Sequence, residues 1–211
     1  MLGLAAQFEF SAFVRLAATA GRAPDVPQRT TIAHAAAAAL DRHDRLAARV
    51  VELDGDPAEV GQPFASLFDD FEERTVPSDW HEQLLKAYIG YSVADDFSGY
   101  LARGADEQTR ALVEQVLAEQ SHVAYAHGEL SRLIEEDPTR ASRMALWGRR
   151  LVGELLSVLG ELMRQHPGLA RLVTAPAGDG GEPATEPTPA TVFSHLTAEH
   201  TRRMERLGLT P

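Results

Sequence analysis

Glu119 and His122 lie three residues apart in the stretch LVEQVLAEQSHVAYAH, which is predicted to be helical. Apolar residues recur there near the 3.6-residue period of a helix, at Leu112, Val116, Val123 and Ala126. Helical residues three apart project from one face, one turn apart. A carboxylate and an imidazole that face a core are costly unless they are paired or bound to a metal, and Glu-x-x-His is a motif by which helix bundles hold metals. The sequence therefore predicts a metal site on this helix.

Further metal donors are predicted on three other helices that must pack beside this one. A dinuclear carboxylate site in a four-helix bundle takes one carboxylate from each of two helices and Glu-x-x-His from each of the other two. Glu9 lies among apolar neighbours in the first predicted helix, and the third offers Asp96, with Asp95 as the alternative. The second offers His43, but Leu40 stands three residues before it, where the pattern requires glutamate.

Hydrophobic periodicity and turn residues predict an all-α chain. Helices are expected at about 2–19, 30–53, 78–103, 106–136 and 138–165, followed by an amphipathic helix at 192–207. Short connections join the first helix to the second and the third to the fourth, whereas residues 54–77 separate the second from the third. Two hairpins joined by a long crossover are the ferritin-like form of a four-helix bundle.

The composition divides the chain into three parts. We expect a helical bundle at 1–173, a flexible linker rich in Pro, Gly and Glu at 174–191, and a C-terminal amphipathic helix within 192–211. The apolar stripe of that last helix is expected to dock on the bundle or on a second subunit. His195, Glu199 and His200 resemble a local metal cluster, but a solvated edge is the interpretation we favour.

Composition also excludes several classes of function. The 211 residues carry a formal net charge of -11, which argues against broad electrostatic binding to nucleic acid. The chain has no cysteine, and therefore no disulfide, zinc–thiolate site or cysteine nucleophile. No apolar run approaches the ~18–20 residues that a membrane span needs, and the N-terminal residues lack the basic start of a signal peptide. These features predict a cytoplasmic protein without a membrane partner.

Four segments resemble the actinobacterial ferritin-like proteins that are related to the bacterial diiron tRNA hydroxylases. They are QFEFSAF, VPSDWHEQLLKAYIGYSVADDFSGY, VLAEQSHVAYA and MALWGRRLVGELL, and the resemblance covers about residues 2–166. It implies iron, mono- or dinuclear, or manganese as the cofactor. The metal-ligand positions that it implies are Glu9, His43, Asp96, Glu119 and His122.

Two functions follow from these observations. The first is a hydroxylase-like oxidoreductase, in which non-haem iron or manganese activates dioxygen or peroxide for an unknown small-molecule substrate. Glu154 is a candidate replacement for the glutamate missing at Leu40, although an i,i+4 ion pair with Arg150 also explains it. The second is a ferritin-like scaffold that has no metal and acts through a protein partner or as a homodimer. The tRNA role is not transferred, because nothing in the sequence supplies an RNA-binding surface.

Overall fold

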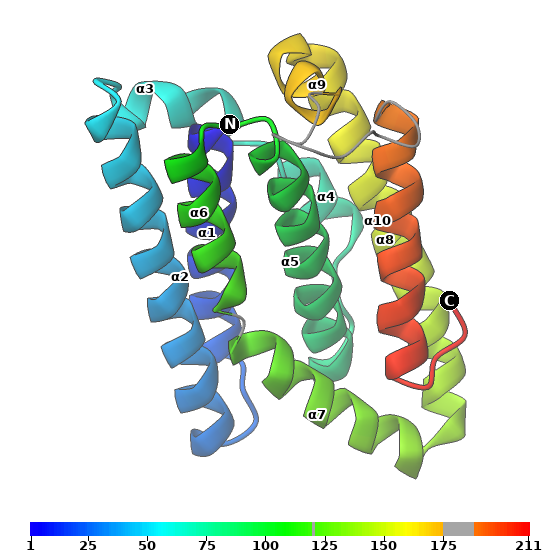
Figure 1. Cartoon of the computed structure of the whole chain (residues 1–211). Helices are drawn as coiled ribbons and strands as arrows, with labels where there is room; N and C mark the ends of the chain where they lie inside the picture. The colour runs from blue at the N-terminus through cyan, green and yellow to red at the C-terminus, as the bar shows by residue number, and fades with distance from the viewer. Residues whose placement is uncertain (120, 175–187) are drawn as a thin grey trace.

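The computed structural model describes residues 1–119, 121–174 and 188–211, and all regular structure in these ranges is helical (Figure 1). The longer helices are α1 (Leu2–Ala20), α2 (Val26–Glu52), α5 (Trp80–Ala102), α6 (Glu107–Ala118), α7 (Ser121–Glu136), α8 (Pro138–Gln165) and α10 (Pro189–Arg206). The shorter ones are α3 (Pro57–Gly61), the 3-10 helix η1 (Gln62–Phe64), α4 (Asp69–Arg74) and α9 (Pro167–Thr174). The prediction of an all-α chain is confirmed, and none of the described helices is long and apolar enough to cross a membrane.

The hairpin of α1 and α2 forms one side of the bundle (Figure 1). Buried Ala35, Ala36 and Ala39 lie on the inner face of α2, where small side chains let the two helices approach closely. α2 begins one turn earlier than predicted, because the side chain of Asp25 accepts a hydrogen bond from the backbone N–H of Gln28 at 2.8 Å. An N-cap of this kind satisfies one of the unpaired N–H groups of the first turn.

The long crossover between α2 and α5 is packed against the bundle. It contains α3, η1 and α4, and it buries Phe64, Phe68 and Phe71 against the bundle. Asp79 then caps α5 by accepting from the backbone N–H of Glu82 at 2.9 Å. The crossover thus returns the chain to the far end of the bundle and sets α5 beside α1.

The predicted helix at 106–136 is two helices in the structure, and the prediction of one continuous helix was wrong. α6 ends at Ala118, and Glu119 has the non-helical dihedral angles φ -92° and ψ 63°. α7 begins at Ser121 and crosses the end of the bundle (Figure 1). Residue 120 lies outside the described residues. Glu119 and His122 are therefore not joined by a helical turn, although the apolar periodicity of the sequence continues across the break.

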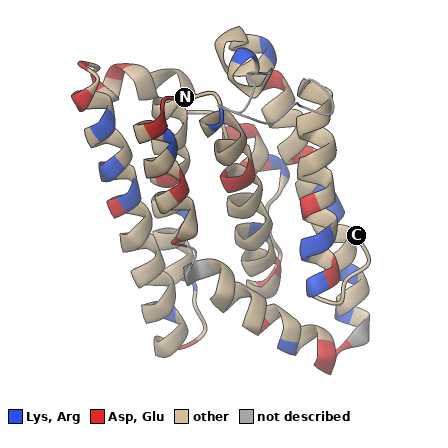
Figure 2. Cartoon of the chain, in the orientation of Figure 1, with Lys and Arg blue, Asp and Glu red and all other residues tan. Residues whose placement is uncertain are grey.

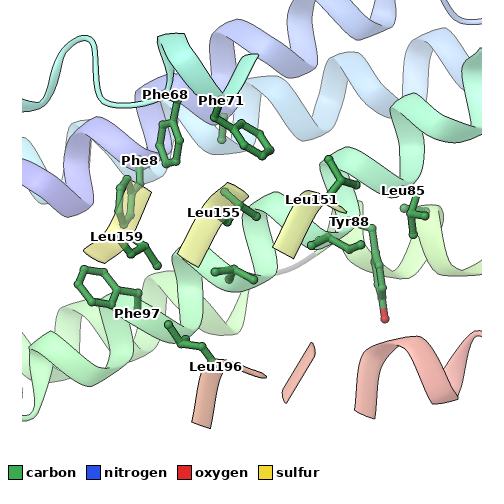
Figure 3. Packing of buried hydrophobic residues seen from close by; sticks show 14 of the residues in the cluster. Phe8, Phe68, Phe71, Leu85, Tyr88, Phe97, Leu151, Leu155, Leu159 and Leu196 are labelled. Carbon is green, nitrogen blue, oxygen red and sulfur yellow. The ribbon is translucent and has the colours of Figure 1, made fainter. Parts of the chain in front are cut away.

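The larger of two apolar clusters joins the hairpin, the crossover and the C-terminal helices. Figure 3 shows Phe8 of α1 and Phe68 of the crossover close to Leu155 and Leu159 of α8. α8 starts where predicted, with Asp137 as its N-cap. α10 packs against α5, α8 and α9, so it docks on the bundle, one of its two predicted sites. Of the predicted linker, 175–187 lies outside the described residues, and α9 was not predicted.

Candidate metal centre

Glu9, Arg42 and Asp95 meet inside the bundle, one from each of α1, α2 and α5. Nε of Arg42 donates to Oε2 of Glu9 at 2.9 Å, and the two side chains are only 3% and 9% exposed. Asp95 lines the same small cavity and interacts electrostatically with both partners. In a bundle of this kind, the residues that face this point would bind a metal. Here they are two carboxylates and a guanidinium.

Arg42 also reaches the end of α6. Its Nη1 donates to the backbone carbonyl of Glu119 at 3.2 Å. The last carbonyls of a helix have no partner within the helix, and a cation is favourable at that end of the helix dipole. The carboxylate of Glu119 instead accepts from Nη1 of Arg45 at 2.8 Å, and it is 43% exposed. Arg42 therefore ties α2 to α1 and α6, whereas the Glu119 side chain lies at the surface.

The two carboxyl groups of the cluster hold protons more tightly than ordinary acids. Burial raises the pKa of Asp95 well above its usual range, and the charge of Glu9 raises it further. Burial also raises the pKa of Glu9, against the opposing charge and hydrogen bond of Arg42. Because one guanidinium serves two carboxylates, Asp95 is the member that we expect to gain a proton first as the pH falls.

The cavity beside the cluster is small. It measures about 10 Å³ and is lined by Phe8, Glu9, Ala12, Arg42, Tyr91, Ala94 and Asp95. That volume is close to the least that admits one water, roughly 10–15 Å³. A two-metal site needs two ions roughly 3.5–4 Å apart together with an open coordination position. The cavity lacks room for such an assembly while Arg42 keeps this conformation.

The structure places the other predicted ligands away from the cluster or outside its description. His43 is half-buried, and its Nδ1 donates to the carbonyl of Ala6 at 2.9 Å. Asp96, the preferred ligand on α5, pairs with Nη2 of Arg203 on α10 at 2.5 Å, so the alternative Asp95 is the residue that faces Glu9. His122 belongs to α7, but its side chain lies outside the described part of the structure.

Glu154 does not replace the glutamate missing at Leu40. Its Oε2 lies 3.5 Å from Nη1 of Arg74, in a surface groove between α4 and α8. The predicted ion pair with Arg150 was therefore wrong, because Arg150 instead donates to the backbone carbonyl of Arg74. Helical spacing does not indicate Arg74 of the crossover as the partner of Glu154, because the two residues are far apart in the sequence.

The three polar residues predicted to form a solvated edge of the last helix do not behave alike. His195 lies at the surface, with Nε2 3.7 Å from Oε1 of Glu199. His200, in contrast, is only 3% exposed, and neither ring nitrogen has a hydrogen-bond partner among the described residues. Burial, followed by the charge of Arg203, lowers its pKa to about 4. For His200 the prediction of a solvated edge was wrong.

The residues at the cluster do not fit a dinuclear metal. Iron and manganese sites of this kind need several carboxylate oxygens and imidazoles around each ion. In the described ranges, no three His, Asp or Glu side chains gather closely enough to hold a metal ion. Arg42 is bonded to Glu9, a carboxylate that would have to hold a metal ion, and a guanidinium carries a positive charge. A fixed positive charge at this point repels a divalent cation.

A second charge cluster, formed by buried Lys86 and half-buried Glu72 and Arg15, lies beside the first, and sequence reasoning did not identify it. Nζ of Lys86, the only lysine of the chain, donates to Oε2 of Glu72 at 2.7 Å and to the carbonyl of Thr75 at 2.8 Å. Nε of Arg15 meets the other oxygen of Glu72 at 2.8 Å. These contacts tie the crossover to α1 and α5. A lysine within the apolar run LLKAYIG was the available signal.

Helix order, the long crossover and carboxylates that face inward from α1 and α5 together define a protein of the ferritin-like class. Residues 1–176 match the family described as "Ferritin-like domain, actinomycetes". The chain belongs to this family, and the predicted ferritin-like fold is confirmed. A comparison with curated proteins gives no match. The relation to the diiron tRNA hydroxylases stays a prediction.

Proposed function

We propose that this protein is a metal-independent ferritin-like scaffold in which Arg42 supplies the internal positive charge, and that it acts by binding protein through its surface. The observation that carries the proposal is the bond from Nε of Arg42 to Glu9, 2.9 Å long, in the interior of the bundle. A guanidinium that is part of the chain does there what a bound cation would otherwise do.

Charge balance supports this proposal. Glu9 and Asp95 would carry two negative charges when ionised, and buried charges are costly without a partner. Arg42 supplies one positive charge, and a proton on one carboxyl brings the cluster to neutrality. Two divalent ions would instead need more anionic ligands, and Leu40 takes one such ligand away. The loss of the glutamate and the presence of the arginine thus favour the same outcome.

The competing proposal is the iron or manganese oxidoreductase predicted from the sequence. It is favoured by Glu9 and Asp95, which come from the two helices expected to give single carboxylates, and by Tyr91, which lines the same cavity. It requires Arg42 to leave the cluster. It also requires Glu119 to exchange its bond to Arg45 for a metal.

Metal analysis after anaerobic incubation with ferrous iron or manganese separates the two proposals. The wild-type chain, without an affinity tag, is compared with the double variant Glu9→Gln/Asp95→Asn. A matched control, Asp69→Asn/Asp70→Asn, removes the same charge from exposed positions of α4. The scaffold proposal expects all three proteins to retain the same trace of metal after desalting. One or two ions per chain in the wild type and the control, lost in the cluster variant, would overturn the metal-independent scaffold and favour the oxidoreductase.

A further inference from the structure

The outer side of the α1–α2 hairpin is a nearly uncharged surface. Phe10 and Val14 of α1 are 38% and 50% exposed, and the exposed positions that follow along the same side are Ala17 and Ala18. The charged residues of α1 point elsewhere, because Glu9 is buried on Arg42 and Arg15 pairs with Glu72. A solvent-facing stripe of this length without charge is unusual for a helix that faces only water.

α2 extends the same surface. It has no Asp, Glu, Lys or Arg between residues 30 and 40, and its ribbon is tan over that stretch in Figure 2. Ala33 and Ala37 are exposed there, and Leu40 is half-exposed. The bond from His43 to Ala6 and the packing of His43 on Phe10, with ring centroids 5.3 Å apart, set the register of the hairpin. In that antiparallel register Leu40 lies level with the part of α1 between Phe10 and Val14.

Size and charge both change along this surface. The larger side chains, Phe10 and Val14, lie toward one end, and the alanines lie toward the turn between the helices. Exposed Arg29 follows the alanine end, and exposed Asp41 and Asp44 follow the end with the larger side chains, where Asp41 lies 3.8 Å from Arg45. A second copy of the surface, turned end over end, would set large side chains against small ones and Arg29 against Asp44. Such self-complementarity is what an isologous two-fold interface requires.

We propose that the occupant of this surface is a second copy of the chain, packed through α1 and α2 in an antiparallel two-fold arrangement. The inference rests on the proposed scaffold function and names its partner. The uncharged centre supplies the buried apolar contact, and the two symmetry-related pairs of Arg29 and Asp44 fix the register at the rim. A different partner protein would not require the surface to complement itself.

Sedimentation of the full chain at several micromolar concentrations gives the first test. The expected mass is twice the 22.9 kDa of one chain. Val14→Glu, which places a charge in the centre, should give monomers with unchanged helix content by circular dichroism. The control Val76→Glu, at a 71% exposed valine outside this surface, should stay dimeric. A monomeric wild type, or a Val14→Glu variant that remains dimeric, would overturn the proposal.

Charge exchange at the rim gives a test that leaves the core untouched. Arg29→Asp and Asp44→Arg should each weaken the dimer at least tenfold, because each places like charges opposite one another. A mixture of the two single variants should form a heterodimer, since both rim pairs are then restored. Failure of the mixture to associate would overturn the antiparallel register. The metal analysis depends only on the cluster of Glu9, Arg42 and Asp95, and sedimentation depends only on the outer surface of the hairpin. A failure of the dimer proposal can therefore be distinguished from a failure of the metal-independent scaffold.

Discussion

Replacing Arg42 by methionine should destabilise the fold more than any other single loss of charge in this molecule. The side chain is 3% exposed and bonded to a carboxylate that is 9% exposed. Removal of one partner from a buried pair costs about 3–5 kcal/mol, because the other charge stays buried without compensation. The carbonyl of Glu119 loses a charged donor as well. We expect the free energy of unfolding at pH 7 to fall by about 4 kcal/mol.

The double variant Glu9→Leu/Arg42→Met tests whether the stability lost in Arg42→Met comes from the buried ion pair. Replacing both members of a buried ion pair by apolar residues is often neutral or stabilising. The double variant should therefore recover most of the loss, down to about 2 kcal/mol or less, because Asp95 alone remains and can take a proton. A coupling of this sign is diagnostic of a buried pair, since two independent packing losses would add.

Urea denaturation followed by circular dichroism measures these differences, and Arg45→Met is the matched control. Arg45 lies one turn from Arg42 and pairs with Glu119, but its side chain is 26% exposed. Its loss should cost about 1 kcal/mol or less, as for other exposed pairs. A loss for Arg42→Met no larger than that for Arg45→Met would show that the buried pair with Glu9 contributes no more than an exposed one. Destabilisation of Glu9→Leu/Arg42→Met by the sum of its two single variants would likewise contradict a coupled buried pair.

Three further predictions concern pH and packing. In Arg42→Met, stability should rise as the pH falls from 7 to 5, because carboxyl groups with raised folded-state pKa values gain protons more readily in the native state; denaturation at both pH values would show a flat profile if the cluster were unimportant. His200 has a pKa of about 4 in the fold against 6.5 unfolded, so its contribution is complete above pH 6.5 and is lost as the pH falls toward 4. His200→Leu should remove that acid loss, at most about 3 kcal/mol, and an unchanged acid profile would contradict the assignment. Gly104→Ala should destabilise by about 1–3 kcal/mol, because a Cβ there lies 2.7 Å from the backbone oxygen of Leu172. Gly153→Ala, with open space around it, should be neutral or stabilising, and equal thermal shifts for the two would contradict the close contact.

Much of the fold was predictable because it rests on local signals. Asp79, Asp137 and the apolar periodicity mark the long helices, and the long connection after α2 fixes their order. The break after Glu119 was not predictable in this way. No glycine or proline marks it, and the stabilising contact comes from Arg42, 77 residues away in sequence. Contacts between distant residues leave no mark in a single sequence.

The candidate site was predicted in part. Glu9 and Asp95 do face the interior, the latter named only as the alternative to Asp96. On α2, His43 was chosen as the inward-facing residue, and its buried neighbour Arg42 was missed. Ile32, Ala39, Arg42 and Leu46 form the buried stripe. A shift of one residue turns the direction of a helical side chain by about 100°. Here that shift replaces His43, which sequence patterns favour as a metal ligand, by the cation Arg42, which they do not.

An anomalous difference map at the manganese absorption edge, from crystals of the full chain grown with manganese, would show whether Glu9 and Asp95 hold a metal. We expect no manganese between Glu9 and Asp95, and electron density for Arg42 with its Nε on Glu9. A manganese peak bound by Glu9 and Asp95, with Arg42 turned away, would contradict this expectation and restore the metal centre.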